Sequence, residues 1–574
     1  GVISMITKGP ASEYHGGLEV ENSHGLDPYG WLLATGNLSG PILKRKMADG
    51  GTRTLLGFRL SGQYNYQKDD DPPALPVYVA KGPGIDLGVL YGSDEAAANA
   101  ERAKLNDPNN VLGRIQAHPL TRKGDLIIPS GENLTNDSID IYKYNPNEKR
   151  QDIDLTGKLD LRVSEAIDFS VTGTFKDQQD QFTPFPQGVA GGWRLVNYQN
   201  NPTNYGRRYR GIARFRHRLG GANDDDNSSD NASTVKISNA SYQIQFAFER
   251  GTNKLYDPRH GDNLFDYGYV GKFNFVNVPR AIVDSNEVKH GGYLTDFTGF
   301  TPGTQNPGLL PYNEFADPED YSTYQAYNGI QPTLYNTIWG NHSNSSLVYN
   351  TFGNSQDDIM TITANSSFDL KLGKTGVHSI QFGLLNEQRT SRSWNVAPIG
   401  LWQQAVQSAN SHFNGLDYTS APIGTFVDPR FPDFTLDQYP YMVVDQPGRR
   451  FYRSLRESLG VPLNEYVNVE ALDPSQLSLS MFSPRELTDR GLVSYYGYDY
   501  LGNPTADGIT FNDFFRLKDA DGVRSLPVAP LNPLYQAAFL KDKFTFNNMI
   551  FSLGVRVERF DLNTKVLKDQ YSLY

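Results

Sequence analysis

The segment 56–66 alternates strictly between apolar and polar side chains. A helix repeats about every 3.6 residues, so only an extended strand places the two kinds of residue on opposite faces. At about 3.4 Å per residue, a tilted strand of this length spans the apolar part of a bilayer. We expect the apolar face to contact lipid and the polar face to line a lumen. The apolar face comprises Leu56, Phe58, Leu60 and Tyr64, and the polar face comprises Arg59, Ser61 and Gln63.

The same alternation recurs along the chain, which predicts an all-β fold made of many similar strands. The clear segments are 152–163, 167–175, 362–372, 380–384 and 549–557. Weaker candidates are 14–23, 30–40, 209–219, 235–249, 267–275 and 531–542.

The predicted strands are joined in two distinct ways. Short turns lie at 164–166 and 373–376, whereas the other connections, listed last, are far longer than those of a compact soluble domain. A transmembrane antiparallel β-barrel has this asymmetry, because its periplasmic turns are short and its extracellular loops are long. A string of soluble β-sandwiches is the alternative, although sandwich strands usually recur about every 8–12 residues. The long connections are 67–150, 176–208, 250–345 and 387–530.

Two of these long connections carry helix signals. The run 93–105 is typical of a short helix capped by Ser93 or Asp94. Ser483-Pro484-Arg485-Glu486 has the form of a capping box with proline at the first helical position. We therefore expect parts of the loops to fold over the mouth of the barrel.

Composition excludes several classes of protein. The 574 residues include no cysteine, so the chain has neither disulfides nor thiolate chemistry. The net charge of −11 argues against a nucleic-acid partner, which requires a concentrated basic face. The mean hydropathy of −0.52 and the lack of a long apolar run exclude a bundle of membrane helices. A barrel remains compatible, since only every second residue of its strands faces lipid.

The motifs of common enzymes are missing from the sequence, so we predict no catalytic residues and no enzymatic activity. The nine histidines form no HExxH pattern, and no G-x-S-x-G elbow occurs. We expect no cofactor, except that acidic loops offer hard oxygen ligands for Ca²⁺. The weak calcium candidates are Asp519 and Asp521 in one loop and Asp224 and Asp226 in another. Solvated loop charge is the simpler interpretation of both.

Aromatic side chains gather in the longest predicted loop. Such rings stack on sugars and apolar ligands and also anchor protein partners. Packing of the loop on itself, or an aromatic girdle at the membrane interface, is the alternative. The candidate residues for contact with a ligand or partner are Tyr495, Tyr496, Tyr498, Tyr500, Trp394 and Trp402.

Four segments resemble TonB-dependent outer-membrane receptors, in particular the subclass with an N-terminal carboxypeptidase-regulatory-like domain. GVISMITKG (1–9) resembles the end of a plug domain, and EYHGGLEVEN (13–22) resembles the first barrel strand. GNLSGPILK (36–44) and the hairpin at 537–561 are similar to the second-strand segment and a later hairpin of that family.

The resemblance implies a barrel of about 22 strands around a plug, with transport energised through TonB. It assigns 1–12 to the end of the plug domain and 13–574 to the barrel, and it leads us to expect that the C-terminal strands are missing from this sequence. The expected partners are outer-membrane lipid, the TonB system, and a surface lipoprotein or other subunits of an outer-membrane complex.

Three functions follow as hypotheses. The first is an outer-membrane receptor that actively takes up a nutrient such as an oligosaccharide, peptide or metal chelate. The second is a structural or accessory barrel subunit that grips partner proteins through its loops. The third is a soluble adhesin or carbohydrate-binding protein, which partition into detergent would separate from the other two.

Overall fold

The computed structural model covers the whole chain, and the description that follows is confined to part of it. The structure describes residues 12–46, 50–80, 85–86, 122–123, 126–127, 139–184, 192–219, 235–306, 309, 319–324, 326–331, 347–372, 376–506, 508–546, 549–569 and 571.

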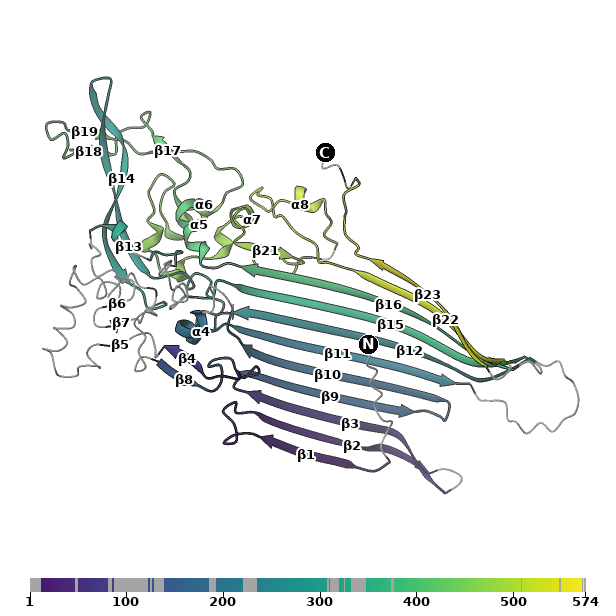
Figure 1. Cartoon of the computed structure of the whole chain (residues 1–574). Coiled ribbons are helices and arrows are strands. Elements are labelled where there is room, and N and C mark those ends of the chain that lie inside the picture. The colour runs from purple at the N-terminus through teal and green to yellow at the C-terminus, as the bar shows by residue number, and fades with distance from the viewer. Residues whose placement is uncertain are drawn as a thin grey trace, which may run out of the picture.

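The main element is an antiparallel sheet of 12 strands, which we call the wall. Eleven of them follow one another as neighbours in chain order, and a short strand pairs with one of these off the path (Figure 1). The path is β1 (His15–Asn22), β2 (Leu32–Lys46), β3 (Thr52–Gln67), β9 (Arg150–Arg162), β10 (Ile167–Gln181), β11 (Thr203–Arg218), β12 (Val235–Tyr256), β15 (Phe352–Leu372), β16 (Val377–Val396), β22 (Leu534–Phe546) and β23 (Met549–Asp561), with β21 (Val493–Tyr496) beside β16.

The register aligns the apolar positions of neighbouring strands. Because residues that lie directly opposite share a face, one apolar row runs across the sheet at each level and fixes how the strands pair. One such row joins Leu56, Leu161, Phe169, Phe215, Ile244 and Ala364. The predicted antiparallel strands are confirmed.

Exposure differs between the two faces of the wall. Lys158 is 4% exposed on the polar face, whereas the next residue, Leu159, is 46% exposed on the apolar face. Ala247 and Phe246 show the same contrast, at 7% and 44%. Side chains crowd together on the inside of a curved sheet and spread apart on the outside. The polar face is therefore concave and the apolar face convex, as the alternation predicted.

Strands extend further than the sequence indicated. The predicted connection 176–208 was wrong at both of its ends, since β10 continues to Gln181 and β11 begins at Thr203. In 176–180 (KDQQD), polar residues occupy both faces, so the apolar alternation stops while the backbone pairing continues. The three other long connections are likewise shorter and occupy 68–149, 257–351 and 397–533.

The two ends of the wall differ. The turn at 164–166 joins β9 to β10 at one end, and β15 and β16 approach each other at that same end, where 373–375 lie outside the described residues. The long connections gather at the opposite end (Figure 1). This asymmetry is the one expected for short turns and long loops of a barrel.

The candidate strand 267–275 does form a strand, but not in the wall. β13 (Gly271–Asp284) pairs only with β14 (Glu287–Pro302) among the described strands, and the two make a projecting hairpin that we call the arm (Figure 1). The alternating Phe273 and Phe275 face aromatic loop residues, with Tyr321 5.2 and 5.0 Å from their ring centres. Alternation alone does not distinguish packing on loops from packing on lipid.

The described residues of 257–351 and 397–533 form what we call the loop domain. Its core holds fully buried side chains, including Trp402 and Leu401 of α5 (Gly400–Ala409) and Phe451 and Leu455 of α6 (Phe451–Leu459). The aromatic rings of Phe451 and Phe482 stack at 4.1 Å. This part of the chain has an ordinary hydrophobic core of its own.

The predicted capping box is confirmed at α7 (Pro484–Thr488). The Glu486 amide donates to Ser483 Oγ at 3.3 Å, and the Ser483 amide donates to Glu486 Oε2 at 2.8 Å. Glu486 Oε2 also accepts from the amides of Arg450 and Phe451, so one carboxylate ties α7 to the start of α6. The other predicted helix, 93–105, lies outside the described residues.

A buried arginine joins the pieces of the loop domain. Arg456 Nη1 donates to the carbonyl of Ala409 at 2.6 Å, and Arg456 Nη2 donates to Asn410 Oδ1 at 2.8 Å and to the Glu465 carbonyl at 2.6 Å. Burial lowers the pKa of the Arg456 guanidinium to about 10, so it remains charged at neutral pH. Backbone carbonyls and the Asn410 side chain accept from its donors, which holds α5 and α6 together.

The remaining described elements are short. None of the described helices is long and apolar enough to cross a membrane. These elements are β4 (Val77–Ala80), β5 (Ile85–Asp86), β6 (Arg122–Lys123), β7 (Leu126–Ile127), β8 (Ile139–Tyr142), α4 (Gly192–Asn197), η5 (Tyr198–Asn200), η7 (Tyr321–Thr323), β17 (Phe413–Leu416), β18 (Gly424–Phe426), β19 (Leu436–Gln438), β20 (Tyr441–Val443), η9 (Val469–Ala471), η10 (Pro474–Gln476), η11 (Leu479–Met481) and α8 (Asp513–Arg516).

Candidate functional site

A hollow of about 400 Å³ lies near the loop-domain end of the wall, between β10, β11, β12 and β15. We call it the concave hollow, because most of its side chains belong to the polar face. Two glycines help to form it: Gly206 and Gly251 offer no side chain, and a Cβ at Gly251 would meet no atom within 4 Å. The hollow is lined by Lys176, Gln178, Asn204, Gly206, Arg207, Arg208, Gly251, Thr252, Asn253, Ser355 and Asp357.

The concave hollow contains charges of both signs. Lys176 Nζ lies 3.7 Å from Asp154 Oδ2 and Arg208 Nε lies 3.3 Å from Glu249 Oε1, so each cation keeps a loose ionic partner. The Ser391 hydroxyl donates to Asp357 Oδ1. Such a surface of amides, hydroxyls and loosely paired ions suits a polar ligand, because ligand groups can replace long ion pairs at little cost.

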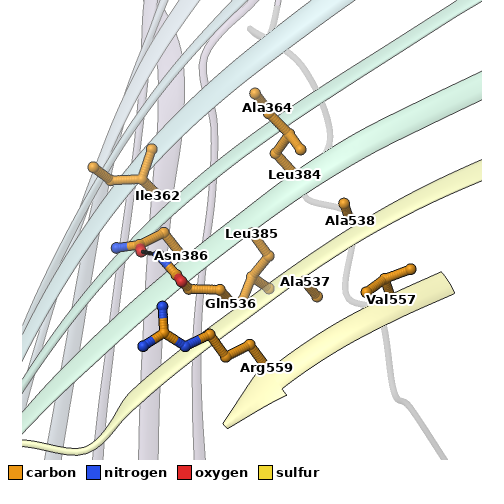
Figure 2. Close-up of a pocket in the computed structure, with 10 residues that line it drawn as sticks. All are labelled: Ile362, Ala364, Leu384, Leu385, Asn386, Gln536, Ala537, Ala538, Val557 and Arg559. Carbon is orange, nitrogen blue, oxygen red and sulfur yellow. Dashed lines mark hydrogen bonds between the residues drawn. The ribbon is translucent and has the colours of Figure 1, made fainter. Parts of the chain in front are cut away.

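A second hollow, of about 470 Å³, lies on the opposite face of the wall (Figure 2). Ala364 and Ala538 are small, which leaves space between Ile362, Leu384 and Val557. The lining is mostly apolar and belongs to the exposed convex face. It fits hydrocarbon rather than a polar ligand.

One end of this convex hollow is polar (Figure 2). Gln536 Nε2 donates to Asn386 Oδ1 at 2.9 Å, and Arg559 lies beside this pair while its Nη2 donates to Asp561 Oδ2 at 2.9 Å. The polar side chains therefore satisfy one another and mark the level at which the apolar band ends.

The six predicted contact residues come together, but most are turned into protein. Trp394 and Trp402 are 4% and 0% exposed in the loop-domain core. Trp402 Nε1 donates to the Phe265 carbonyl at 2.7 Å, and Trp394 Nε1 donates to the Tyr500 carbonyl at 3.0 Å. Both indoles are fully used in packing, which is what self-packing of the loop predicts.

The tyrosines of this group differ in position. Tyr498 is buried in the core, and Tyr495 and Tyr500 pack against it. Burial raises the pKa of all three phenols, so they stay protonated and able to donate; Tyr495 donates to the Leu526 carbonyl at 2.9 Å. Tyr496 is half-buried outside that cluster. Contact of these residues with a ligand or partner stays a prediction.

The calcium candidates Asp519 and Asp521 lie beside a cation of the protein. Arg450 Nη2 donates to Asp519 Oδ2 and lies 3.7 Å from Asp521 Oδ2. The amides of Asp521 and Val523 donate to Asp519 Oδ1 at 3.0 and 2.9 Å. These contacts account for the carboxylates without a metal, and the described residues contain no group of three or more metal-binding side chains. Asp224 and Asp226 lie outside the described residues, so calcium stays a prediction.

A buried polar network ties two connections near the mouth, those between β3 and β9 and between β10 and β11. Arg194 Nη2 donates to Glu148 Oε1 at 3.0 Å, and Thr183 donates to the same oxygen. Burial raises the pKa of the Glu148 carboxyl, an effect that Thr183 and Arg194 oppose. The Asn145 amide donates to Asp69 Oδ2 at 2.6 Å. The network holds the loops in one arrangement.

Sequence reasoning located the polar face but missed the concave hollow and the network. Alternating polar residues indicate which face a side chain occupies, whereas the hollow depends on which residues the register places opposite the glycines of β11 and β12. The pairing of Gly206 with Asn253 and of Gly251 with Arg208 sets this. Gly206 and Gly251, within two polar strands, were the available signal.

No family model matches the sequence, and no curated protein matches it. Similar solved structures include a mutant of the ferric enterobactin receptor PfeA from Pseudomonas aeruginosa, 9% identical, with a TM-score of 0.18. The match covers 96% of this chain and 54% of that chain. The siderophore receptor PiuA from Acinetobacter baumannii is 9% identical, with a TM-score of 0.24, 96% of this chain covered and 58% of that chain.

The siderophore receptor PirA from Acinetobacter baumannii is 8% identical with a TM-score of 0.19, over 96% of this chain and 74% of that chain. This chain therefore spans little more than half the length of the first two similar structures. At such identities and TM-scores the likeness carries no argument about fold or ligand, and the wall's own geometry is what constrains its role.

Proposed function

We propose that this chain is part of an outer-membrane receptor of the TonB-dependent type, which takes up a polar nutrient across the outer membrane of a Gram-negative bacterium. One observation carries the proposal: a single curved sheet has an exposed apolar convex face, a polar concave face and a folded loop domain at one end. The convex face contacts lipid, the concave face lines the path, and the loop domain covers the mouth. The chain has no catalytic role in this proposal.

The energetics of the convex face support a lipid environment. Large apolar side chains such as Leu384 and Val557 are 61% and 66% exposed, and they continue across every strand of the wall's central part. A continuous apolar band of this extent in water would drive aggregation, since burial of apolar surface stabilises by about 25 cal/mol per Å². Contact with hydrocarbon removes that penalty for every strand at once.

The concave hollow supports the proposal that the nutrient passes along the polar face. It lies between the loop domain and the middle of the wall, and its lining combines ions with amide groups. An oligosaccharide, a peptide or a metal chelate each presents polar groups that such a lining binds. Active transport further requires the TonB system, which the resemblance of the sequence implies.

A second candidate function is an accessory barrel subunit that holds partner proteins. The observation that favours it is the outer end of the arm, where apolar residues are exposed instead of buried. Val283 of β13 and Ile423 and Val427 of the neighbouring loop are 58%, 61% and 51% exposed. The Ala281 amide donates to Asp428 Oδ2 at 2.7 Å, which joins the two segments into one tip. A surface lipoprotein or another subunit would bind there.

The structure suggests a clean test of the uptake proposal. Val396 of β16 and Val493 of β21 are Cα partners, so an Asn-Gly turn in place of 397–492 closes a two-residue hairpin. In the complete protein we expect the variant to insert into the outer membrane and to lose nutrient uptake. Uptake at the wild-type rate by the inserted variant would contradict the proposal.

A matched variant separates the two functions. Val283, Ile423 and Val427 are exposed, so changing all three to serine should leave folding intact. If the chain is a receptor, uptake persists in this triple variant. If it is an accessory subunit, partners no longer copurify with it, while the Asn-Gly variant described above has no uptake to lose.

A further inference from the structure

Strand β11 carries five arginines on one face, and we call them the arginine ladder. Its sequence, TNYGRRYRGIARFRHR, places a cation at every second position except one, where Ile212 intervenes. Residues two apart on a strand share a face. The ladder consists of Arg208, Arg210, Arg214, Arg216 and Arg218.

The register places the ladder on the concave face. Arg214 is the Cα partner of Ser170, and Ile212 is the partner of Ala247. Both partners are buried on the concave side of the wall. The guanidinium groups therefore point to the side that the proposed function assigns to the path.

Carboxylates compensate only part of this charge. Glu249 lies 3.3 Å from Arg208 Nε and 3.7 Å from Arg210 Nε. Asp168 lies 2.6 Å from Arg216 Nη2 and 2.7 Å from Arg218 Nη2. Among the described residues, two acidic side chains thus pair with four of the five cations. The guanidinium charge cannot be removed by titration in the physiological range.

The ladder is also accessible. The four ion-paired arginines keep 41–64% of their side-chain surface exposed. Arg214 lies between the two ion-paired ends, and its Cα partners Ser170 and Gln245 are neutral. Exposed guanidinium groups can exchange a protein carboxylate for a ligand oxyanion, most readily where the ion pair is long, as at Arg208 and Arg210.

The ladder connects the concave hollow to the short-turn end of the wall. Arg208 lines the hollow, and Arg218 Nη1 donates to the carbonyl of Glu165 in the turn between β9 and β10. Ten residue steps separate the two arginines, which corresponds to roughly 33 Å at about 3.3 Å per residue. That length is close to the thickness of a bilayer's hydrocarbon core, about 30 Å.

We propose that the arginine ladder binds and guides a ligand that carries two or more oxyanion groups, carboxylate or phosphate. Planar guanidinium forks bind such groups through paired hydrogen bonds, and regular spacing lets the ligand form one contact before it releases another. The proposal rests on the proposed uptake function and narrows its substrate to polyvalent anions.

The test uses the complete protein in detergent, with tripolyphosphate as the probe and titration calorimetry as the measurement. We expect Arg214→Gln and Arg210→Gln each to weaken binding about three- to tenfold, because each removes one charged fork. Raising the salt concentration from about 50 to 200 mM should weaken wild-type binding further. Arg250→Gln is the matched control on the neighbouring strand β12, since Arg250 pairs with Asp358 on the opposite face and lies outside the lining of the concave hollow, so this substitution should leave affinity unchanged.

Three results would overturn the proposal. In the first, the wild-type protein fails to bind tripolyphosphate. In the second, Arg250→Gln weakens binding as much as Arg214→Gln, which indicates an effect of net charge alone. The third is that Arg214→Gln lowers the melting temperature without changing affinity, which indicates that the ladder holds another part of the protein. Uptake of the native nutrient, measured in the same strains, reports on the proposed function separately: uptake without probe binding rejects only the ladder.

Discussion

The wall and the loop domain place their apolar side chains in opposite ways. In the wall, Leu553 and Val555 are 60% and 68% exposed, whereas in the loop domain Trp402 and Phe451 have no exposed surface. Both arrangements occur within one chain and are linked by continuous backbone at β16. The difference shows that the two regions are suited to different surroundings, hydrocarbon for the wall and water for the loop domain.

The two regions also differ in what holds them together. The inner strands of the wall are joined by backbone hydrogen bonds to both neighbours, so each depends on its register more than on any one side chain. The loop domain depends on a few large side chains and on buried polar contacts such as those of Arg456. We therefore expect a point substitution in the loop domain to destabilise that domain strongly. In the wall, we expect its effect to depend on whether the side chain faces lipid or water.

Removing Trp402 should have the largest effect. Its ring lies 5.9 Å from Phe265 and 5.2 Å from Tyr269, so Trp402→Ala opens a cavity and should cost the loop domain about 3–5 kcal/mol. Limited proteolysis of the membrane-inserted protein should show faster cleavage within 397–533 and an unchanged wall. Phe511→Ala, at an aromatic residue 59% exposed, is the control that should leave cleavage unaffected. Equal sensitivity of wall and loop domain would break the distinction between them.

Phe246 and Gln245 test the two faces of the wall directly. Phe246 is on the convex face and Gln245 on the concave face of β12. Phe246→Arg should destabilise the inserted barrel by about 2–4 kcal/mol near the midplane, because it places a charge in hydrocarbon. Gln245→Arg should change stability far less. Reversible unfolding in urea from lipid vesicles measures both, and an equal loss from the two substitutions would contradict the assignment of the faces.

Acid should strengthen the loop domain through Glu470. Burial raises the pKa of the Glu470 carboxyl to about 7, and Tyr321 donates to its Oε1 at 3.2 Å. A group whose folded pKa is raised stabilises fully below its unfolded pKa, and that stability is lost as the pH rises through the folded value. Stability should therefore fall between about pH 4.5 and pH 7, by on the order of 3 kcal/mol.

The variant Glu470→Gln removes the charge and should abolish this dependence. The loop domain of the variant should be more resistant to protease than the wild type at pH 8, and equally resistant at pH 4.5. Hydrogen exchange of residues near 469–471 provides the same comparison. A pH profile that is unchanged in the variant would show that another group is responsible.

The smallest predicted effect concerns the cap of α7. Ser483→Ala removes the acceptor of the Glu486 amide and the donor to the Gly448 carbonyl, and it should cost about 1 kcal/mol. Ser480→Ala is the control, since Ser480 lies outside the capping box and its hydroxyl forms a hydrogen bond with the hydroxyl of Ser478. Faster exchange of the α7 amides in Ser483→Ala alone is the expected result.

The wall was accessible to sequence reasoning because lipid imposes a simple period. Segments such as 549–557 lie within β23, which runs from Met549 to Asp561. Strand ends were not predictable in the same way, as 176–180 shows, since backbone pairing continues where both faces turn polar. In the arm at 271–302, the sequence predicted a strand but not its place outside the wall, because an alternating strand packs equally well on aromatic loop residues.

The candidate site was less predictable than the wall. Aromatic residues at Trp394 and Trp402 looked suited to ligand contact, yet the structure buries both in a core that no periodicity announces. The concave hollow depends on a register between strands that only the folded sheet establishes. Local composition therefore identified the region near the mouth, but it did not show which side chains of that region are exposed to a ligand.

The length of β12 has a consequence for how a ligand approaches. It has 22 residues, which at about 3.3 Å per residue and a tilt of about 45° gives a height of roughly 50 Å. The apolar band of such a barrel is about 25 Å tall, so in the proposed receptor β12 extends beyond the hydrocarbon of the membrane. Salt screens charges beyond about 8 Å at physiological ionic strength. At the outer end of the wall, an anion would be farther than this from the negative charge of the membrane surface. The charges of the protein would therefore act on it first.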